Sequence, residues 1–339
     1  MSVAPLGREQ MAEKRPSGIH RWALVTAGAT FPLLMLGGIV TSLDVGLAVP
    51  DWPTTFGYQM FLYPIGKMLE STGVFWEHSH RLMGSLVGML TIGLATWITL
   101  SVYRWRTESR RWIFGLGIAA LVGVCIQGVL GGLRVELLAR ELAVVHGAFA
   151  QAFFCLVVGI AVVTSKSWSE AAASAPAEAV HGLRRAALWT CAFVYGQLVL
   201  GALVRHFQVT VLFHALGAIV VALACVTLRR RVQRDFGGNG FLTKPARRLV
   251  HLLGLQVVLG IVTWIATRHT VPGEQIPIAD VVSATSHVLV GALLLMTAFV
   301  IKVRSHRIEI EETASEESLD PETFENPSWS SAEPAGSMR

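Results

Sequence analysis

Four of the eleven histidines lie at matched places along the chain, each followed within four residues by a glycine. The pairs are His80 and Gly84, His146 and Gly147, His214 and Gly217, and His287 and Gly291. Neutral imidazole is a common axial ligand of haem iron, whereas zinc would need cysteine or carboxylate ligands beside each histidine pair. We expect each histidine to lie about four to six residues inside the outer end of its helix, so that all four have a similar depth. We therefore predict two bis-histidine haem sites, although an interhelical hydrogen bond is the simpler role for any single histidine.

The stretch FWEHSHRLMG, residues 75–84, places four ionisable side chains at the start of an apolar segment. Residues advance by about 100° around a helix, so Glu77 and His80 share a face and His78 points elsewhere. We expect His80 to be the ligand and His78 to be peripheral. Glu77 suits a general acid or base beside a bound porphyrin, or an acid at a helix N-terminus. No acid matches it in the second half, which predicts that one haem is acted upon and the other conducts electrons.

Three arginines stand at the ends of the same apolar segments: Arg81, Arg134 and Arg205. Guanidinium groups pair well with carboxylates such as haem propionates. The alternative is an arginine that extends along the helix surface to reach water at the membrane boundary. We expect these three residues to lie near the level of the haems.

The elements that must position these residues are membrane-spanning helices. Hydrophobic residues make up 53% of the 339-residue chain and charged residues only 15%, against about 25% charged in soluble proteins. Apolar stretches of spanning length occur at 22–43, 76–103, 112–133, 142–164, 186–204, 209–228, 248–267 and 281–301. We expect the fifth and sixth spans, around the turn RHFQ, to be short. The sequence predicts an all-α integral membrane protein.

The basic residues indicate the orientation of these helices. Lys and Arg concentrate before the first span and in every second loop, which predicts cytoplasmic N- and C-termini in the cell (inner) membrane. The formal charge of +5 follows this alternating pattern and gives no sign of nucleic-acid binding. No cleavable signal is expected, because the polar segment 1–21 precedes an apolar segment too long for a signal peptide.

An internal repeat predicts the architecture. Odd-numbered spans carry a Leu-Gly signature, in LGGIVTS (36–42), QGVLGGL (127–133), QLVLGAL (197–203) and QVVLGIV (256–262), and even-numbered spans carry the histidines. We expect four helical hairpins that form two pseudo-symmetric four-helix bundles. The expected organisation is a cytoplasmic segment 1–21, a first half 22–164, a cytoplasmic linker 165–185, a second half 186–303 and a disordered acidic tail 304–339.

Two further features qualify this picture. The loop at about 44–75 is rich in Pro, Gly and aromatic residues, so we expect it to fold over the outer surface. All four cysteines lie inside apolar spans without C-x-x-C spacing and are expected to be buried free thiols: Cys125, Cys155, Cys191 and Cys225.

EHSHR, GLAVPDWPTTFG, VLGGLRV, VVHGAFAQ, FHALGA and SHVLVGA together resemble the haem A synthase family over residues 22–303. The resemblance implies oxidation of the C8 methyl of haem O to a formyl group by two successive hydroxylations, giving haem A for terminal oxidases. It implies that His80 and His146 hold the substrate haem and that His214 and His287 hold a haem b cofactor. Glu77 matches the acidic residue linked to catalysis in that family.

The resemblance also implies partners and shows one departure. The implied partners are haem O, haem A, the lipid bilayer, the enzyme that makes haem O, cytochrome oxidase assembly factors and a further copy of the chain. Many bacterial relatives carry a cysteine pair around the PDWP motif, where this chain has Val49 and Thr55. No disulfide or thiol-based step is therefore expected in that loop.

Two other classes of protein are weighed against this enzyme. A bis-histidine dihaem cytochrome that exchanges electrons with quinol would explain the histidines, but not Glu77 or the difference between the halves. A transporter could also contain repeats, but charges at the membrane midplane and broken helices are not evident in the sequence.

Overall fold

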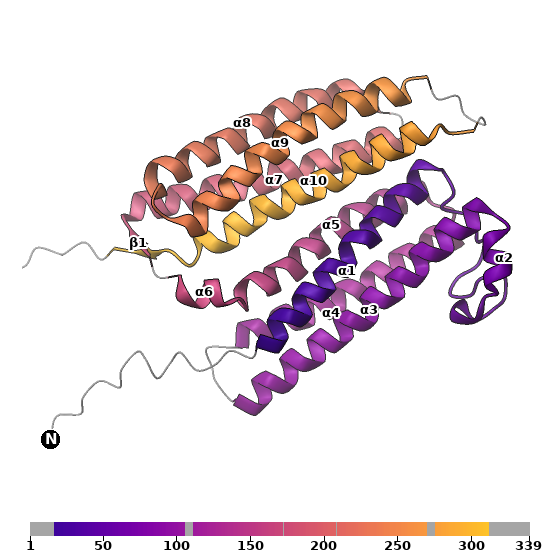
Figure 1. The fold of residues 1–339 in the computed structure, drawn as a ribbon, viewed down its shortest axis with the longest axis horizontal. Helices are drawn as coiled ribbons and strands as arrows, with labels where there is room; N and C mark the ends of the chain where they lie inside the picture. The colour runs from indigo at the N-terminus through magenta and orange to yellow at the C-terminus, as the bar shows by residue number, and fades with distance from the viewer. Residues whose placement is uncertain (1–16, 106–110, 172, 208, 270–274, 312–339) are drawn as a thin grey trace, which may run out of the picture.

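The computed structural model describes residues 17–105, 111–171, 173–207, 209–269 and 275–311 (Figure 1). Eight long helices occur in these ranges: α1 (Ser17–Ser42), α3 (Thr72–Trp105), α4 (Arg111–Glu136), α5 (Arg140–Val163), α7 (Ala177–Phe207), α8 (Val211–Phe236), α9 (Gly240–Thr267) and α10 (Ile278–Ser305). All eight are long and apolar enough to cross a membrane. The predicted all-α multi-pass architecture is confirmed.

The eight helices form two four-helix bundles. In the first bundle α1, α3, α4 and α5 contact one another in chain order, and α5 returns to contact α1; α7, α8, α9 and α10 repeat this arrangement. Between the bundles, α10 contacts α1 and α5, and α5 contacts α7. A pseudo-two-fold axis relates α1 to α7 and α5 to α10, so the α1–α10 contact is equivalent to the α7–α5 contact. The sequence repeat therefore corresponds to two bundles with equivalent roles.

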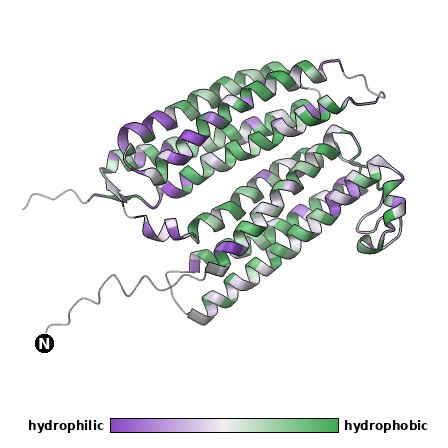
Figure 2. Cartoon of the chain, in the orientation of Figure 1, coloured by the Kyte–Doolittle hydropathy of each residue, from purple (hydrophilic) through white to green (hydrophobic). Residues whose placement is uncertain are grey.

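Helices α5 and α10 form the wall between the bundles. Half of the apolar window of each is buried, 50%, whereas the other six spans bury at most 33%. The outward faces of those six helices expose large apolar side chains, including Leu223, Val258 and Ile261. Figure 2 shows the apolar residues concentrated along the middle of the helices. Lipid is the solvent that such a surface requires.

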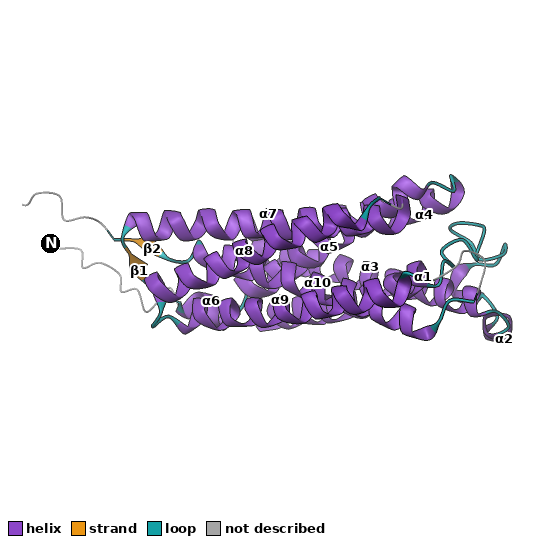
Figure 3. Ribbon diagram, turned by 90° about the horizontal axis from the view of Figure 1, so that it is seen from above, coloured by secondary structure: helices purple, strands orange, loops and turns teal. Residues whose placement is uncertain are grey.

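The two ends of the molecule differ in structure. Figure 3 shows the helices running along the long axis, with α2 at one end and β1 and β2 at the other. The first end carries the loop between α1 and α3, residues 43–71, which contains η2 (Met60–Leu62) and α2 (Ile65–Leu69). We call this loop the first loop and this end the histidine end. The opposite end, which carries α6 (Lys166–Glu170), is the linker end.

Two predicted boundaries are wrong at the linker end. The segment predicted as a linker, 165–185, contains α6 and β1 (Ser174–Ala175), and α7 begins at Ala177. The segment predicted as a disordered tail contains β2 (Glu309–Ile310), which pairs in parallel with β1. Backbone hydrogen bonds of this ladder outweigh the acidic composition that suggested disorder. Residues 312–339 lie outside the described part of the chain.

Helix lengths and termini also differ from expectation. The fifth and sixth spans are not short, because α7 has 31 residues and α8 has 26. Three residues of the RHFQ turn belong to α7, which ends at Phe207, and Gln208 lies outside the described residues. The first helix begins at Ser17 instead of residue 22. Residues 1–16 of the predicted N-terminal segment are not described.

The cysteines are free, as predicted, but not all of them are buried. Cys155 and Cys225 are buried and Cys191 is half-buried. Cys125 is exposed, because its position on α4 faces away from the bundle, toward the lipid. An apolar span therefore predicts immersion in the membrane without telling which face meets protein.

Candidate functional site

The first loop is organised around Asp51. Its carboxylate accepts hydrogen bonds from the Phe56 amide at 2.7 Å, the Gly57 amide at 2.9 Å and the Thr54 hydroxyl. Burial alone would raise the pKa of Asp51, but the bonds from Gly57, Thr54 and Phe56 outweigh it and lower the pKa below its ordinary value. Gly57 has φ +75°, a conformation that glycine adopts without steric cost. The turn of the PDWPTTFG motif thus has a defined fold.

Glu77 and Arg81 attach this loop to α3. Glu77 Oε2 accepts the Val49 amide at 2.9 Å, and Glu77 Oε1 accepts Arg81 Nη2 at 2.8 Å. Arg81 also donates to the main-chain oxygens of Val49 (2.9 Å), Asp51 (2.7 Å) and Thr54 (3.1 Å). Both terminal nitrogens of Arg81 are engaged in this way. In this structure Arg81 holds the loop, and its pairing with a haem propionate stays a prediction.

His78 is buried beneath the same loop. Its side chain points away from His80, as the helical geometry predicted, but the expectation that it is peripheral is wrong, because only 2% of the residue is exposed. Thr55 Oγ1 lies 3.2 Å from His78 Nδ1, and the ring of Tyr63 lies 5.2 Å away. Val49 and Thr55 are fully buried. Val49 and Thr55 stand where many bacterial relatives have a cysteine pair, and here both are held to α3 by hydrogen bonds.

The four predicted ligands meet in two facing pairs. The ring centroids of His80 and His146 lie 6.3 Å apart in the first bundle, and those of His214 and His287 lie 6.2 Å apart in the second. The rings are inclined by 75° and 71°, respectively. Each pair joins one helix of the inter-bundle wall, α5 or α10, to a helix across its own bundle, α3 or α8. The predicted grouping of the histidines into two pairs is seen in the structure.

The separation of the rings fits a metal ion held between them. A metal–imidazole bond is about 2 Å and the ring centroid lies roughly 1.2 Å behind the ligating nitrogen, so two rings on opposite sides of one metal have centroids about 6.4 Å apart. The Nδ1 atoms of all four histidines are buried without a hydrogen-bond partner among the described residues. Nowhere in those residues do three His, Cys, Asp or Glu side chains group as a metal site. A planar group with two axial positions fits this donor set better than a tetrahedral ion.

Each imidazole lies against a glycine of a Leu-Gly signature. A Cβ added at the glycine would lie 3.0–3.2 Å from the ring atom Cε1. The four contacts join Gly37 to His80, Gly131 to His146, Gly201 to His214 and Gly260 to His287. That range is tighter than ordinary van der Waals contact, so a larger residue would displace the ring. The glycines of the signature therefore make room for the histidines.

The depth of the histidines was predicted incorrectly from the helix ends. His214 lies only three residues after the first residue of α8, whereas His287 lies nine residues after the first residue of α10. The expected offset of four to six residues holds for His146 alone. The helices begin at different heights because the loops differ. Contact with the matched glycines gives the four rings their equivalent positions.

Arg134 and Arg205 lie at the histidine end, as expected. Arg134, at the end of α4, packs against Gly46 of the first loop and interacts electrostatically with Glu77. Arg205 Nη2 donates to the main-chain oxygens of Thr41 (3.1 Å) and Ser42 (3.2 Å). Arg205 thus caps the end of α1 and joins the two bundles.

Three glutamines were missed by the sequence analysis. Each lies four residues before a signature glycine and reaches the histidine of the next helix. Gln127 Nε2 donates to His146 O (2.9 Å), Gln197 Nε2 donates to His214 O (2.6 Å), and Gln256 Nε2 lies 3.4 Å from His287 Nε2. The sequence signal for them is a glutamine at the same position of three repeats, in the motifs QGVLG, QLVLG and QVVLG.

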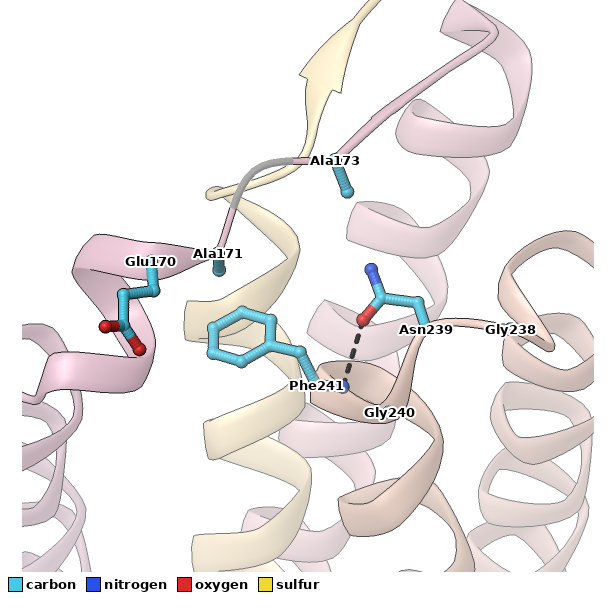
Figure 4. A pocket seen from close by; sticks show the side chains of 7 residues that line it. All are labelled: Glu170, Ala171, Ala173, Gly238, Asn239, Gly240 and Phe241. Atoms are coloured by element: carbon cyan, nitrogen blue, oxygen red, sulfur yellow. Dashed lines mark hydrogen bonds between the residues drawn. The ribbon is translucent and has the colours of Figure 1, made fainter. Parts of the chain in front are cut away.

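A shallow hollow at the linker end is unrelated to these sites. Figure 4 shows it between α6, the segment after it and the turn between α8 and α9. Its lining consists of Glu170, Ala171, Ala173, Gly238, Asn239, Gly240 and Phe241. Asn239 Oδ1 accepts the Phe241 amide at 2.9 Å and so caps α9. The hollow is open, and only Glu170 and Asn239 among its lining residues have polar side chains, so we assign it no function.

Fold and site together define an internally duplicated, multi-pass membrane protein with one interior histidine pair in each bundle. The profile of the COX15-CtaA family, described as cytochrome oxidase assembly protein, matches residues 20–213, which is more than half of the chain. The chain belongs to this family.

Individual relatives agree with this assignment. The heme A synthase of Exiguobacterium sibiricum is 29% identical over 197 residues, 56% of this chain and 61% of that protein. The heme A synthase of Beijerinckia indica is 26% identical over 300 residues, 78% and 81% of the two chains. Human heme A synthase COX15 is 29% identical over 143 residues, 35% of this chain and 33% of that protein. The chain thus spans less than two thirds of several of the relatives that it matches.

Proposed function

We propose that this protein is a haem A synthase, which oxidises the C8 methyl group of haem O to a formyl group. Two successive hydroxylations give a gem-diol, and loss of water then gives the formyl group of haem A. The observation that carries the proposal is a facing histidine pair in each bundle, with the Glu77–Arg81 ion pair on the helix that carries His80. The names of the relatives and the family membership support it.

The two pairs receive different haems in this proposal. His80 and His146 hold the substrate haem O in the first bundle, next to Glu77. His214 and His287 hold haem b as the resident cofactor, which supplies one-electron transfer when bound. Oxidation of a methyl group to a formyl group removes four electrons in total, and a neighbouring one-electron centre would pass them singly to an external oxidant. The wall of α5 and α10, each of which carries one of the ligands, brings the two sites close together.

Glu77 is the proposed proton-handling group. Its Oε1 accepts a hydrogen bond from Arg81 Nη2 at 2.8 Å. Its Oε2 accepts the Val49 amide, and a carboxylate oxygen has a second lone pair with which to accept a proton. Arg81 and the first loop fix the position of Glu77 one helical turn before His80. The chain thereby holds a base at a set place beside the substrate site and covers it from outside.

Orientation and partners follow from the same assignment. The linker end carries a group of basic side chains, including Arg184, Arg231 and Arg304, and both ends of the described chain. By the positive-inside rule this end is cytoplasmic and both haem sites lie toward the outer face. We propose haem O and haem A as ligands and the enzyme that makes haem O as a partner, because the lipid-soluble substrate must pass between the two enzymes. Cytochrome oxidase assembly factors and a further copy of the chain are also proposed partners.

The decisive experiment measures the haem product. The protein is produced together with a source of haem O, and the extracted haems are separated by chromatography. Formylated or hydroxymethyl haem supports the proposal. If neither appears while both haems are bound and quinol is oxidised, the protein is instead a dihaem electron-transfer cytochrome.

A matched pair of variants tests Glu77. Glu77→Gln keeps an acceptor for the Val49 amide but loses the charge, so we expect bound haem with product formation lowered by about 10²–10⁴-fold. Glu141→Gln removes an exposed acid at the same end of the molecule and should leave product formation unchanged. Normal turnover in Glu77→Gln would remove Glu77 from the mechanism.

A further inference from the structure

The residue four before each signature glycine differs in one of the four repeats. Three repeats have glutamine there and the first has leucine: Gln127, Gln197, Gln256 and Leu33. The odd residue belongs to α1 and faces the helix that carries His80. The difference thus falls on one ligand of the substrate pair and on neither ligand of the cofactor pair.

The glutamines tie a histidine to the neighbouring helix. Gln127 on α4 donates to the main-chain oxygen of His146, and Gln197 on α7 does the same for His214. Gln256 on α9 lies against the imidazole of His287 itself. In each case an amide restrains the segment that bears the ligand, because the helices can separate there only by breaking a polar contact that is shielded from water.

Leu33 occupies the corresponding space without a donor. Its Cδ1 lies 4.0 Å from the position of a Cβ on Gly84, four residues after His80. The amide of Gln256 lies 3.2 Å from the same point on Gly291, four residues after His287. Leucine fills this space by apolar contact alone. The described side-chain hydrogen bond between α1 and α3 is Trp22 Nε1 to Leu90 O at 2.8 Å, about 15 Å farther along α3.

Release of a histidine requires the helix segment to move. The ring of His80 lies with Cε1 3.2 Å from the Cβ position of Gly37, so rotation of the side chain toward α1 is blocked. The segment around His80 must therefore shift away from α1 before the imidazole can leave a metal. The main-chain oxygen of Leu33 interacts with the imidazole of His80, as the main-chain oxygens of the three glutamines do with their histidines. A further hydrogen bond from a side chain would resist the shift, and the side chain of Leu33 supplies none.

We propose that Leu33 makes His80 the exchangeable ligand, through which haem O enters and haem A leaves the first bundle. The inference rests on the proposed function, because it takes the first bundle as the substrate site. A substrate haem must be released after each turnover, whereas a cofactor haem must stay. Glutamine side chains restrain both ligands of the second bundle, but only His146 in the first. Leu33 is therefore a positioning residue: it affects His80 because its side chain makes no hydrogen bond to the helix that carries this histidine.

Carbon monoxide measures the exchange directly. A ferrous haem with two histidine ligands binds carbon monoxide only after one ligand dissociates, so the binding rate reports that dissociation. Protein loaded with haem O and haem b should show a fast phase from the first bundle and a slow phase from the second. Leu33→Gln should slow the fast phase by roughly five- to tenfold, as expected for one added hydrogen bond. Leu33→Met, which adds no donor, should leave it unchanged.

A reciprocal variant guards against a folding artefact. Gln197→Leu removes the tie to His214 and should accelerate the slow phase by a similar factor. An unchanged fast phase in Leu33→Gln, with haem O bound, overturns the inference, as does an unchanged slow phase in Gln197→Leu. Absence of haem O from the first bundle in the wild-type protein, shown by extraction, contradicts the proposed function instead.

Discussion

Glu77 and Arg81 lie one turn apart on α3 and form an ion pair of 2.8 Å, and the other hydrogen bonds of their side chains run to the first loop. The two side chains are nearly buried, with exposed fractions of 5% and 10%. A single ion pair thus fixes the acid that we propose as the proton-handling group and holds the loop above it. The contacts that position Glu77 are therefore the same contacts that hold the first loop in place.

Removal of Arg81 should loosen the first loop and lower stability. Arg81→Met leaves Glu77 as a buried charge without its partner and breaks three bonds to the loop, so we expect a loss of about 3–5 kcal/mol in the free energy of unfolding. Hydrogen exchange of the peptide over 47–58 should rise at the same time. The control is Arg268→Met, an exposed site at the same end. Equal exchange in the two variants would show that the loop is held by other contacts.

The glycines beside the histidines offer a matched pair on one helix. Gly260→Ala places a Cβ 3.0 Å from Cε1 of His287, whereas a Cβ at Gly254 meets nothing within 4 Å. We expect Gly260→Ala to displace the imidazole and to weaken retention of the second haem by about 1–3 kcal/mol. Haem loss to a scavenging apoprotein measures the effect. Gly254→Ala should retain haem as the wild type does, and similar loss from both variants would rule out the steric role.

The proposed cofactor site can be tested separately from the proposed substrate site. His214→Ala removes one axial ligand of the second pair and should abolish the low-spin spectrum of that haem while the first pair keeps its own. Visible and electron paramagnetic resonance spectra of the purified protein distinguish the two. An unchanged low-spin signal from the second haem would exclude His214 as a ligand.

Asp51 gives the first loop a pH dependence. Its pKa is lower in the folded loop than in the unfolded chain, so its contribution to stability is complete above the ordinary aspartate pKa of about 3.9 and is lost as the pH falls through the folded value. The protection factors of residues 51–57 against hydrogen exchange, which are corrected for the intrinsic pH dependence of the exchange rate, should therefore be constant at neutral pH and fall in the acid range. In Asp51→Asn this fall should vanish. A fall that persists in that variant would assign it to another group.

The sequence predicted the ligand pairs because the repeat carries them. A histidine and a Leu-Gly signature at fixed places in four hairpins leave few ways to pair the rings. The role of Arg81 was hidden, since its partners are main-chain oxygens of a loop whose fold depends on Asp51 and on a glycine with positive φ. Leu33 was overlooked for another reason. Its significance lies in what the other three repeats have at that position, and this became visible only when the glycine contacts set the register.

The short parallel ladder was also beyond prediction. Two residues of β1 and two of β2 have no distinctive pattern, and an acidic segment after α10 suggested disorder. Main-chain bonds from Glu309 to Ala173 and from Glu311 to Ala175, both 3.0 Å, hold it in place. Arg184 adds a bond to Ile308 O at 3.0 Å. Pairing of this kind depends on where the helices deliver the chain ends.

The shared wall of α5 and α10 restricts how this duplicated protein could diverge. Each of these helices carries one histidine on the face toward its own bundle and packs its opposite face against the neighbouring bundle. A substitution on either helix therefore changes the packing around both histidine pairs. Specialisation should therefore have accumulated on the six helices outside this wall and in the loops. The acid of α3 and the leucine of α1, two features that distinguish the bundles, are both found there.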